Sequence, residues 1–418
     1  MPNSTSSSKL RVAIIGGGIA GLSAAAFLRK NRHCSIIVYE RRDADSQETS
    51  AGLGLGANGI SIVKQLGIDR KEISGVVGAG YRTYNIHEKE ISKSRVGDEQ
   101  DGDCGLWLVY RQDLKDALLR RVTSEDEDGE AINVLYGCHI VNVDPEAGVV
   151  EFADGSSVEA DLIIGADGIR SKVRGAVIPA SHPEPTPCGL SMYRFVIPMD
   201  VVMNTITTNG TIPAMYNYDD GIFIAVIAAG DKGNRNVIMY PCQGHKLMNC
   251  VCAVPDSSLK SSAKLEYSWN AKGSVEELLE EIEDFPEWLK RVFSRPTSRT
   301  PQVALFQVRD QEPLPTYFKG RTVLIGDAAH AMVPYQAQGV NQTFEDVEGL
   351  SVLFANISDR DKVPGILQIW DSIRRPRASE IQTGSRASQA KIATKSAGDA
   401  ILSVKPHVGM KEALEQLE

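Results

Sequence analysis

Short apolar runs, rich in β-branched residues, recur along the chain and predict the strands of a parallel sheet. Residues 10–15 are apolar almost throughout, as expected for a strand that is buried on both faces. Similar runs predict further strands at residues 35–40, 106–110, 161–165 and 321–325.

Other stretches alternate between apolar and polar positions, which is typical of antiparallel strands. Residues 134–143, 149–152 and 157–162 predict a short meander with a turn at Asp154-Gly155. From about residue 189 to 253, runs such as 221–227 and 236–240 predict an antiparallel sheet, which we expect to form a separate lobe.

Helical patterns separate these runs. Residues 22–30 are rich in Ala and Leu, and the residues after Arg111 place apolar side chains on one helical face. Ser274 begins a capping box, and another helix is predicted to begin near residues 285–289. Two more helices are predicted at about residues 339–354 and 366–397.

The first predicted strand leads directly into a G-x-G-x-x-G motif at Gly16, Gly18 and Gly21. Gly16 permits a tight turn, Gly18 lets a pyrophosphate approach the backbone, and Gly21 lets the helix pack on the strand. We therefore expect that only hydrogen fits easily at these three positions. Glu40 ends the second strand about twenty residues later, where a carboxylate accepts from a ribose hydroxyl. The pattern predicts a dinucleotide site and favours an adenosine ribose without a 2′-phosphate.

A glycine-dense segment at residues 51–56 follows this site closely. It either admits a second flat part of the ligand or forms a flexible connection, and its composition favours neither. Arg111 begins a predicted helix, where the macrodipole disfavours a cation unless an anion lies close by. Arg111 is thus a candidate contact to a phosphate or a ribityl chain, with a surface arginine as the alternative.

Composition narrows the class of protein. The 418 residues suffice for two or three domains or one large composite fold. With 45 basic and 54 acidic residues the net charge is −9, which argues against nucleic acid as the main partner. The seven cysteines are odd in number and form no C-x-x-C pair, so a reducing compartment is favoured over a disulfide framework or a zinc site. Residues 1–8 are polar, and no run of about eighteen apolar residues predicts a membrane span.

Three stretches, in this order, resemble the FAD-dependent aromatic hydroxylases, which are single-component flavoprotein monooxygenases. The first is the glycine motif with Glu40, the second is Asp167 within residues 165–174, and the third is Asp327 within residues 326–334. The closest resemblance is to the salicylate hydroxylase-like branch, which includes fungal enzymes of secondary metabolism. Further similar segments extend the match from about residue 10 to 377. Family members often have glycine where this chain has Ala337, so the loop beside the isoalloxazine is expected to differ slightly.

This resemblance implies an α/β fold. A Rossmann-like FAD-binding domain of the p-hydroxybenzoate hydroxylase type would be interleaved with a mixed-sheet substrate domain and a long C-terminal helix. We expect the first part of the FAD-binding domain at residues 9–180, with an inserted strand segment near 75–110. The substrate lobe would follow at 181–300, the returning FAD-binding part at 301–360 and a helical segment at 361–418.

The chemistry agrees with the resemblance. Aromatic carbon reacts too slowly with O₂ and no side chain activates oxygen, so a cofactor must supply the reactivity. The family uses FAD, which NADPH or NADH reduces and which then forms a C4a-hydroperoxide. The protein must hold the flavin, stabilise its anionic reduced form and exclude water. The helix that starts at Gly339 would offer free N–H groups for the second task.

The predicted site residues fall into two groups. The resemblance and the motifs together give these cofactor-binding residues: Gly16, Gly18, Gly21, Glu40, Arg41, Gly52, Leu53, Gly54, Arg111, Asp167, Asp327, Gly339, Val340 and Asn341. The predicted catalytic residues are Arg194, Tyr218, Tyr240 and Pro334, and no metal site is predicted.

Each predicted catalytic residue has a structural alternative. By family analogy Pro334 lies where oxygen and substrate meet, and the less favoured alternative is a helix-breaking loop proline. Arg194 resembles a family position that pairs with a phenolate or carboxylate, or it is a solvent-exposed arginine on an edge strand. Tyr216, Tyr218 and Tyr240 lie on predicted strands of the substrate lobe, where one of them could hydrogen-bond a substrate oxygen or all could simply pack. His330 is expected to be structural.

The sequence thus predicts an enzyme that uses FAD, NADPH or NADH, and O₂. It would hydroxylate, epoxidise or dearomatise an aromatic, phenolic or indolic small molecule. One alternative is a flavin halogenase, although its W-x-W-x-I-P signature is absent. Another is a non-catalytic flavin-binding redox protein. We expect a cytoplasmic monomer or homodimer without a nucleic-acid or membrane partner.

Overall fold

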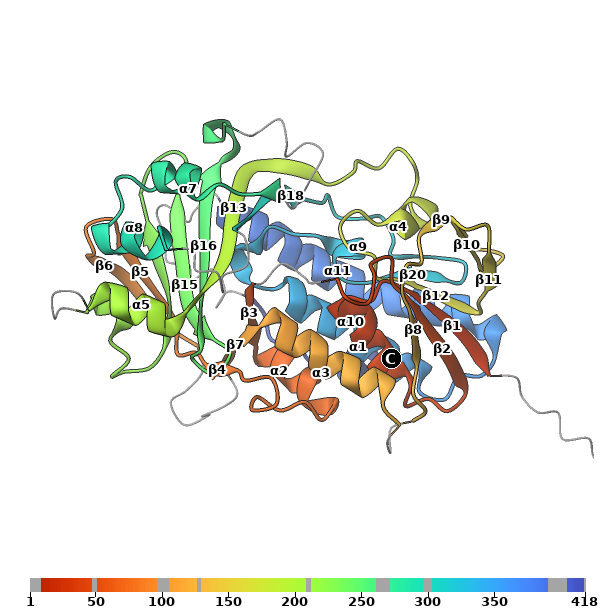
Figure 1. The fold of residues 1–418 in the computed structure, drawn as a ribbon. Coiled ribbons are helices and arrows are strands. Elements are labelled where there is room, and N and C mark those ends of the chain that lie inside the picture. The colour runs from red at the N-terminus through yellow and green to blue at the C-terminus, as the bar shows by residue number, and fades with distance from the viewer. Residues whose placement is uncertain are drawn as a thin grey trace, which may run out of the picture.

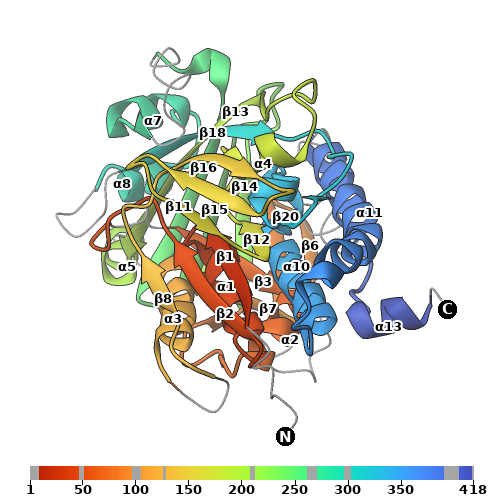
Figure 2. The same ribbon diagram turned by 90° about the vertical axis from the view of Figure 1, so that its right-hand side faces the viewer.

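The computed structural model describes residues 9–46, 51–96, 105–125, 129–207, 212–260, 271–295, 303–389 and 404–416. The described chain forms two lobes that lie side by side (Figure 1). One lobe is built on a six-stranded sheet and the other on an eight-stranded sheet. Figure 2 shows the late helices α10 and α11 together along one flank of the first lobe.

The six-stranded sheet is parallel except for one edge strand. Its order is β19-β20-β12-β1-β2-β8, and only the edge pair β19–β20 is antiparallel. Helix α1 (Ile19–Leu28) is buried along nearly its whole length because it packs against α3 (Arg111–Thr123) and α10 (Gly339–Phe354). The strands are β1 (Leu10–Ile15), β2 (Cys34–Tyr39), β8 (Asn133–Leu135), β12 (Leu162–Gly165), β19 (Phe318–Lys319) and β20 (Thr322–Leu324).

Two three-stranded sheets flank this core. One is the meander β9 (Ile140–Asp144), β10 (Val149–Phe152) and β11 (Ser157–Glu159), which packs beside α4 (Lys172–Val177). The other joins β3 (Gly52–Gly56), β7 (Leu106–Tyr110) and β4 (Val76–Val77), and α2 (Ala57–Gln65) follows β3 directly.

The eight-stranded sheet draws its strands from distant parts of the chain. Its order is β17-β18-β13-β16-β15-β14-β5-β6, and the single parallel pair is β14–β5. Helices α5 (Met199–Ile206), α7 (Val275–Glu281) and α8 (Glu287–Phe293) accompany it. Its strands are β5 (Gly80–Asn85), β6 (Glu90–Arg95), β13 (Thr186–Pro198), β14 (Phe223–Ala228), β15 (Asn236–Cys242), β16 (Leu247–Pro255), β17 (Ala271–Lys272) and β18 (Ala304–Asp310).

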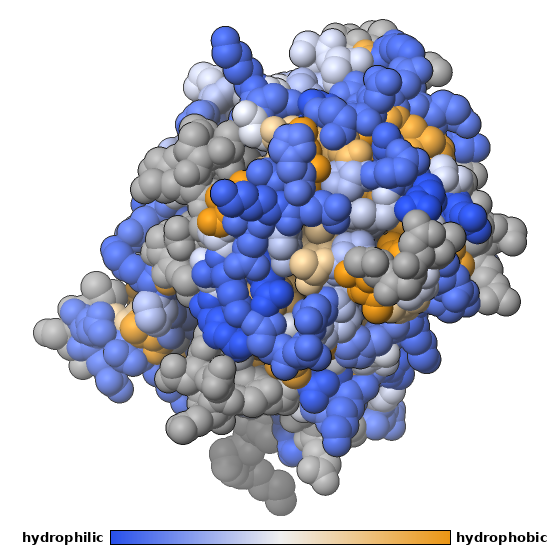
Figure 3. All heavy atoms as spheres, turned by 90° about the vertical axis from the view of Figure 1, so that its left-hand side faces the viewer, coloured by the Kyte–Doolittle hydropathy of each residue, from blue (hydrophilic) through white to orange (hydrophobic). Residues whose placement is uncertain are grey.

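Alternation along these strands gives the large sheet two apolar faces. Alternate side chains such as Tyr193, Phe195 and Cys250 form one cluster with residues of α5, α7 and α8. The opposite face carries Met192 and Val251 and turns toward the first lobe. Figure 3 shows that the outer end of this lobe is mainly hydrophilic, with hydrophobic side chains in small separate spots.

The remaining elements are short, apart from α11. This helix (Val363–Gln389) continues through Pro376 and packs on α10. Within the described ranges, every helix is too short or too polar to cross a bilayer. The other helices are α9 (Asp327–His330), α13 (Met410–Glu415), η1 (Ala214–Tyr216), η2 (Asp256–Ser258), η3 (Pro334–Gln336) and η4 (Arg360–Lys362).

Several sequence expectations need correction. The predicted run 134–143 is two strands, β8 and β9, that belong to different sheets, and 157–162 is likewise divided between β11 and β12. Tyr216 lies in η1 and Tyr218 in the turn after it, so neither is on a strand. Each of these runs is interrupted where the chain passes from one sheet to another. The periodicity of the sequence does not reveal such a passage. Part of the predicted helix 366–397, residues 390–397, and all of residues 1–8 lie outside the described residues.

Candidate functional site

The carboxyl edge of the six-stranded sheet gathers the three sequence motifs. Strands β20, β12, β1 and β2 are consecutive neighbours and run parallel, so their carboxyl ends meet at one edge. Gly16 follows β1, Glu40 follows β2, Asp167 comes just after β12, and Asp327 comes just after β20. Ligands of open parallel sheets bind at this edge.

The three glycines of the first turn differ in how closely other atoms of the protein would approach an added Cβ atom. A Cβ at Gly16, whose φ is +115°, would lie 2.4 Å from the carbonyl oxygen of Ala166, and one at Gly21 would lie 1.9 Å from that of Gly16. At Gly18 the protein leaves open space. Our expectation that all three positions exclude a side chain is therefore wrong for Gly18 within the protein itself. Any need for glycine there has to come from a ligand.

Glu40 is held against the glycine turn. Its Oε2 accepts a 2.6 Å hydrogen bond from the Gly17 N–H, and its Oε1 accepts one of 2.9 Å from the Arg42 N–H. Arg41 beside it is exposed. Helix α1 begins after Gly18 with no side-chain cap, so its first N–H groups are available to an anion.

The two other motif aspartates have different environments. Asp167 accepts hydrogen bonds from the Ser171 hydroxyl and from the N–H groups of Lys172 (2.8 Å) and Val173 (3.3 Å), so it holds the start of α4. Burial raises the pKa of Asp167 despite these donors. Asp327 is exposed at the start of α9.

The glycine-dense strand β3 is tied to the start of α10 by Asn341. The buried Asn341 amide accepts from the Gly56 N–H (2.9 Å) and donates to the carbonyl oxygens of Gly54 (3.3 Å) and Ala337 (2.8 Å). Residues 339–340 are half-buried at the helix start, and Gln338 provides no side-chain cap there. The first N–H groups of α10 thus resemble those of α1.

Ala337, in the loop before α10, adopts a left-handed conformation with φ +51° and ψ +32°. Such a backbone costs an L-residue roughly 1–2 kcal/mol, and glycine loses about 0.5–1 kcal/mol of entropy relative to alanine. We expect Ala337→Gly to raise the unfolding free energy by up to about 1 kcal/mol, seen as a higher Tm in thermal unfolding. Ala355→Gly, at a right-handed position (φ −52°), should lower the Tm, and a fall in both variants would contradict this account.

A buried network of charged side chains connects α10 with α9 and α11. Arg374 contacts Glu345 (2.7 Å) and Asp346 (3.0 Å), and Asp346 also contacts His330 (2.7 Å). All four side chains are almost fully buried. Asp346 accepts from the Gly326 N–H (2.9 Å) as well, which links the network to the Asp327 turn. His330 is thus paired inside the core, as expected of a structural residue.

The eight-stranded sheet presents Arg194 and Tyr240 toward the first lobe. In the register, Arg194 on β13 lies opposite Val251, and Tyr240 on β15 lies opposite Asn249, two residues from Val251 on β16. These side chains therefore share one face. A Cβ on Gly52 of β3 would lie 2.7 Å from the Tyr240 ring, so the glycine-dense strand approaches this face closely.

The other predicted residues lie nearby or apart from this face. Arg111 begins α3. The pKa of Arg194 is lowered mainly by burial, and the positive charge of Arg111 lowers it further. Pro334 is exposed at the start of η3. Tyr218 packs against the helix-covered cluster and, with Tyr240, lines a small cavity. The structure thus brings Arg194, Tyr240 and Gly52 together, whereas Tyr218 belongs to the helix-covered cluster and meets Tyr240 at the small cavity.

Sequence reasoning missed Asn249 and Tyr335. Asn249 is fully buried on the face of Arg194, yet its Nδ2 has no hydrogen-bond partner. Tyr335, next to Pro334, is buried among Leu190 and Met192, and its hydroxyl also lacks a partner. The signal that could have revealed Asn249 is an asparagine within the apolar run of β16. A buried amide in such a strand needs hydrogen-bond partners.

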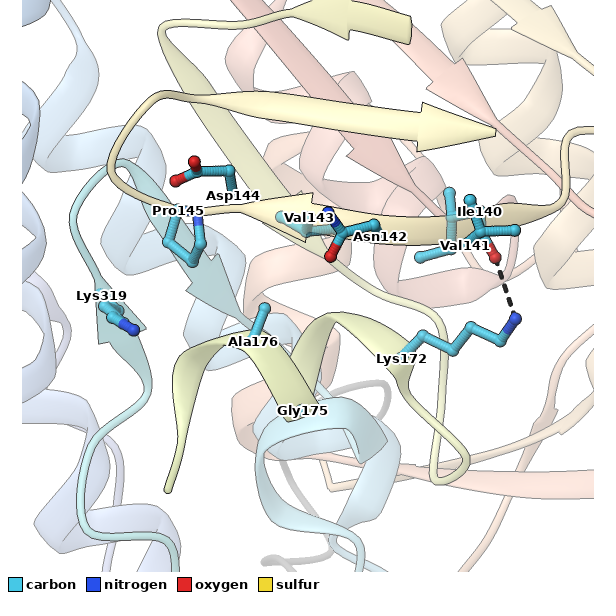
Figure 4. Close-up of a pocket in the computed structure, with 10 residues that line it drawn as sticks. All are labelled: Ile140, Val141, Asn142, Val143, Asp144, Pro145, Lys172, Gly175, Ala176 and Lys319. Atoms are coloured by element: carbon cyan, nitrogen blue, oxygen red, sulfur yellow. Dashed lines mark hydrogen bonds between the residues drawn. The ribbon is translucent and has the colours of Figure 1, made fainter. Parts of the chain in front are cut away.

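A separate groove lies between β9 and α4 (Figure 4). Its volume is about 370 Å³, and Lys172 and Lys319 lie at its two ends. The Lys172 ammonium donates to the carbonyl oxygen of Ile140 (3.0 Å). None of the predicted site residues lines this groove, so it is distinct from the edge described above.

Comparison with known proteins agrees with the geometry. A family model described as "FAD binding domain" matches residues 9–385. The chain is 27% identical over 387 residues to the FAD-dependent monooxygenase ntnJ of Nectria sp, covering 90% of this chain and 83% of that protein. It is 27% identical over 396 residues to a salicylate hydroxylase of Pseudomonas putida, covering 90% and 84%. A solved salicylate hydroxylase substrate complex superposes with a TM-score of 0.72 at 27% identity, covering 99% and 93%. These findings confirm the predicted fold class.

Proposed function

Because the chain belongs to the FAD binding domain family, we propose that it is an FAD-dependent monooxygenase acting on an aromatic small molecule. In the overall reaction, an aromatic C–H, O₂, NAD(P)H and a proton give a hydroxylated ring, NAD(P)⁺ and water. One oxygen atom enters the substrate and the other leaves as water. The nicotinamide provides the two electrons. The meeting of three motif turns at one sheet edge, opposite a sheet face with unpaired donors, carries this proposal.

The residues present fit FAD. The open space at Gly18 and the uncapped start of α1 suit a pyrophosphate, and Glu40 is fixed where it can accept from a ribose hydroxyl. Exposed Asp327 would accept from ribityl hydroxyls. When bound, FAD would take up the electrons of the nicotinamide and activate O₂.

The chain's own groups have three tasks around that cofactor. The first N–H groups of α10, from Gly339, would stabilise negative charge on the reduced ring. Asn341 would keep β3 at a fixed distance from this helix start. Apolar side chains around Tyr335 on one side and Leu106 on the other would exclude water from the region between the lobes.

Finer assignments are also part of the proposal. Either NADPH or NADH is the reductant, and hydroxylation, epoxidation and dearomatisation all fit this site. We propose domain limits of 9–180, 181–300, 301–360 and 361–418. The eight-stranded sheet of the substrate lobe also includes strands from residues 80–95 and 304–310. The six cysteines in the described ranges are free thiols, which favours a cytoplasmic location. A monomer or homodimer is proposed.

The test is anaerobic stopped-flow reduction of the purified protein by NADPH and by NADH. A panel of phenols, aryl carboxylates and indoles is added separately to each. We expect a bound yellow flavin and a ligand that accelerates its reduction at least about tenfold, equal to about 1.4 kcal/mol of barrier. A protein without flavin, or a flavin that neither nicotinamide reduces with any ligand, would favour a non-catalytic flavin-binding protein instead.

A further inference from the structure

The segment at residues 331–338 joins two parts of the proposed cofactor site. It begins after α9, which Asp327 starts, and it ends where Gly339 starts α10. Because both ends would contact FAD, this segment has to pass along the cofactor between the ribityl chain and the ring. Its position therefore determines how α10 presents its first N–H groups and how well water is excluded.

Two carbonyl oxygens of this segment are buried outside regular secondary structure. They belong to Ala331 and Val333, which have extended backbones with ψ angles of 129° and 146°. A buried carbonyl oxygen needs a hydrogen-bond donor, and a helix cannot supply one to a backbone in this conformation. The N–H of Gln311 reaches the Ala331 oxygen only at 3.3 Å. The position of the segment therefore depends on donors from other elements.

Helix α11 supplies these donors. The Gln382 amide donates to the carbonyl oxygen of Ala331 (2.9 Å), and the Ser385 hydroxyl donates to that of Val333 (2.5 Å). Both donors are fully buried and lie three residues apart, which places them on one face of the helix. The Gln382 amide also donates to the carbonyl oxygen of Gln311, just after β18, so it ties the segment to the eight-stranded sheet as well.

Helix α11 is itself anchored to α10. Arg374, earlier on α11, pairs with Glu345 and Asp346 of α10. Further along, α11 packs closely on η3, since a Cβ on Gly384 would lie 3.2 Å from the Nε2 of Gln336. One part of α11 thus holds α10 and a later part holds the segment at residues 331–338, so the helix fixes the two relative to each other.

We propose that Gln382 and Ser385 are positioning residues, which hold the segment at residues 331–338 against the cofactor through its backbone. This inference rests on the proposed function, because it concerns how the FAD site is assembled. With the segment held, the first N–H groups of α10 stay at a fixed distance from the ring and water is excluded. Without this hold, NAD(P)H, O₂ and a proton would more often give NAD(P)⁺ and H₂O₂, with no oxygen atom transferred to a substrate.

The first measurement is hydrogen exchange of the holoenzyme. Gln382→Met and Ser385→Ala each remove one of the two donors. We expect backbone amides within residues 331–338 to exchange roughly threefold to tenfold faster in each variant, as the loss of one hydrogen bond predicts. Ser385→Thr keeps the hydroxyl, so its exchange should stay near that of the wild type. Unchanged exchange in both Gln382→Met and Ser385→Ala would overturn the proposal.

The second measurement distinguishes positioning from simple structural support. The reduction potential of the bound flavin, measured against indicator dyes, should become more negative in Gln382→Met and Ser385→Ala. The reason is that displaced N–H groups stabilise the anionic reduced ring less. Ser385→Thr should keep the wild-type potential. Faster exchange with an unchanged potential would show that the two side chains only stabilise the fold, which contradicts a positioning role.

Asn31→Leu is the matched control. The buried amide of Asn31, like that of Gln382, donates to two backbone carbonyl oxygens, but these belong to Phe354 (2.7 Å) and Ile357 (3.1 Å) at the other end of α10. This variant should speed exchange near residues 354–357 and leave both the segment and the potential unchanged. A change of potential as large as that in Gln382→Met would mean that general loosening is the cause, and the proposal would be wrong.

The proposed function and the positioning role fail separately. A wild-type protein that holds no flavin, or whose flavin neither nicotinamide reduces, would overturn the proposed function. A protein whose flavin is reduced, but whose potential is the same in Gln382→Met and Ser385→Ala as in the wild type, would overturn only the positioning role.

Discussion

Replacing Gly21 with alanine is expected to give a protein that retains no FAD and unfolds readily. The new Cβ would lie 1.9 Å from the carbonyl oxygen of Gly16, which belongs to the turn itself, so the backbone would have to move. We expect the free energy of unfolding to fall by more than about 3 kcal/mol. Urea unfolding followed by circular dichroism, together with the flavin content after purification, measures both effects.

Gly18→Ala is the matched comparison. Gly18 has a φ of −81° and open space around its Cβ position, so the unfolding free energy without flavin should change by no more than about 0.5 kcal/mol. FAD affinity, measured by fluorescence titration, should nevertheless fall at least about tenfold, because the methyl group would occupy the approach of the pyrophosphate. Unchanged FAD affinity would show that the phosphates do not approach the backbone at Gly18.

Arg374→Met is expected to cost about 3–5 kcal/mol of stability, since it removes the buried guanidinium that pairs with both Glu345 and Asp346. Arg374 also donates to the Gln342 carbonyl oxygen (3.2 Å), so the variant loosens α10 near its start. Urea unfolding of the holoenzyme measures the loss. Lys405→Gln is the control, because the Lys405–Glu380 pair is exposed and its removal should cost less than about 1 kcal/mol. Equal costs for the two variants would contradict the importance of burial.

The same network predicts an acid limit. Burial opposes ionisation of Glu345, but the hydrogen bond from Arg377 and the charges of Arg374, His407 and Arg377 outweigh it and lower its pKa to about 2. A lowered pKa stabilises the fold above the unfolded value of about 4.3. This contribution, about 3 kcal/mol, should be lost as the pH falls from about 4.5 to about 2. A pH series of urea unfolding tests this, and Glu345→Gln should flatten that part of the profile.

Much of the first lobe follows from local sequence. Strands β1 and β7 and helix α10 have the predicted limits, because continuous apolar runs and an abrupt glycine turn leave few alternatives. The sequence also located the three motif turns, since a tight turn requires glycine within a few residues of the strand that precedes it. By contrast, the division of residues 134–143 between two sheets depends on pairing with distant strands, so periodicity could not reveal it.

The sequence by itself determined the dinucleotide edge of this protein, because strand, turn, helix and acid are close along the chain and each has its own residue requirement. Only the tertiary structure decided what faces that edge. The register of β13, β15 and β16 puts Arg194 and Tyr240 beside Asn249, and β3 reaches them at Gly52 from another lobe. It also packs Glu345 and Asp346 against Arg374, which lies 28 residues after Asp346. Contacts between distant segments depend on packing, which no local pattern encodes.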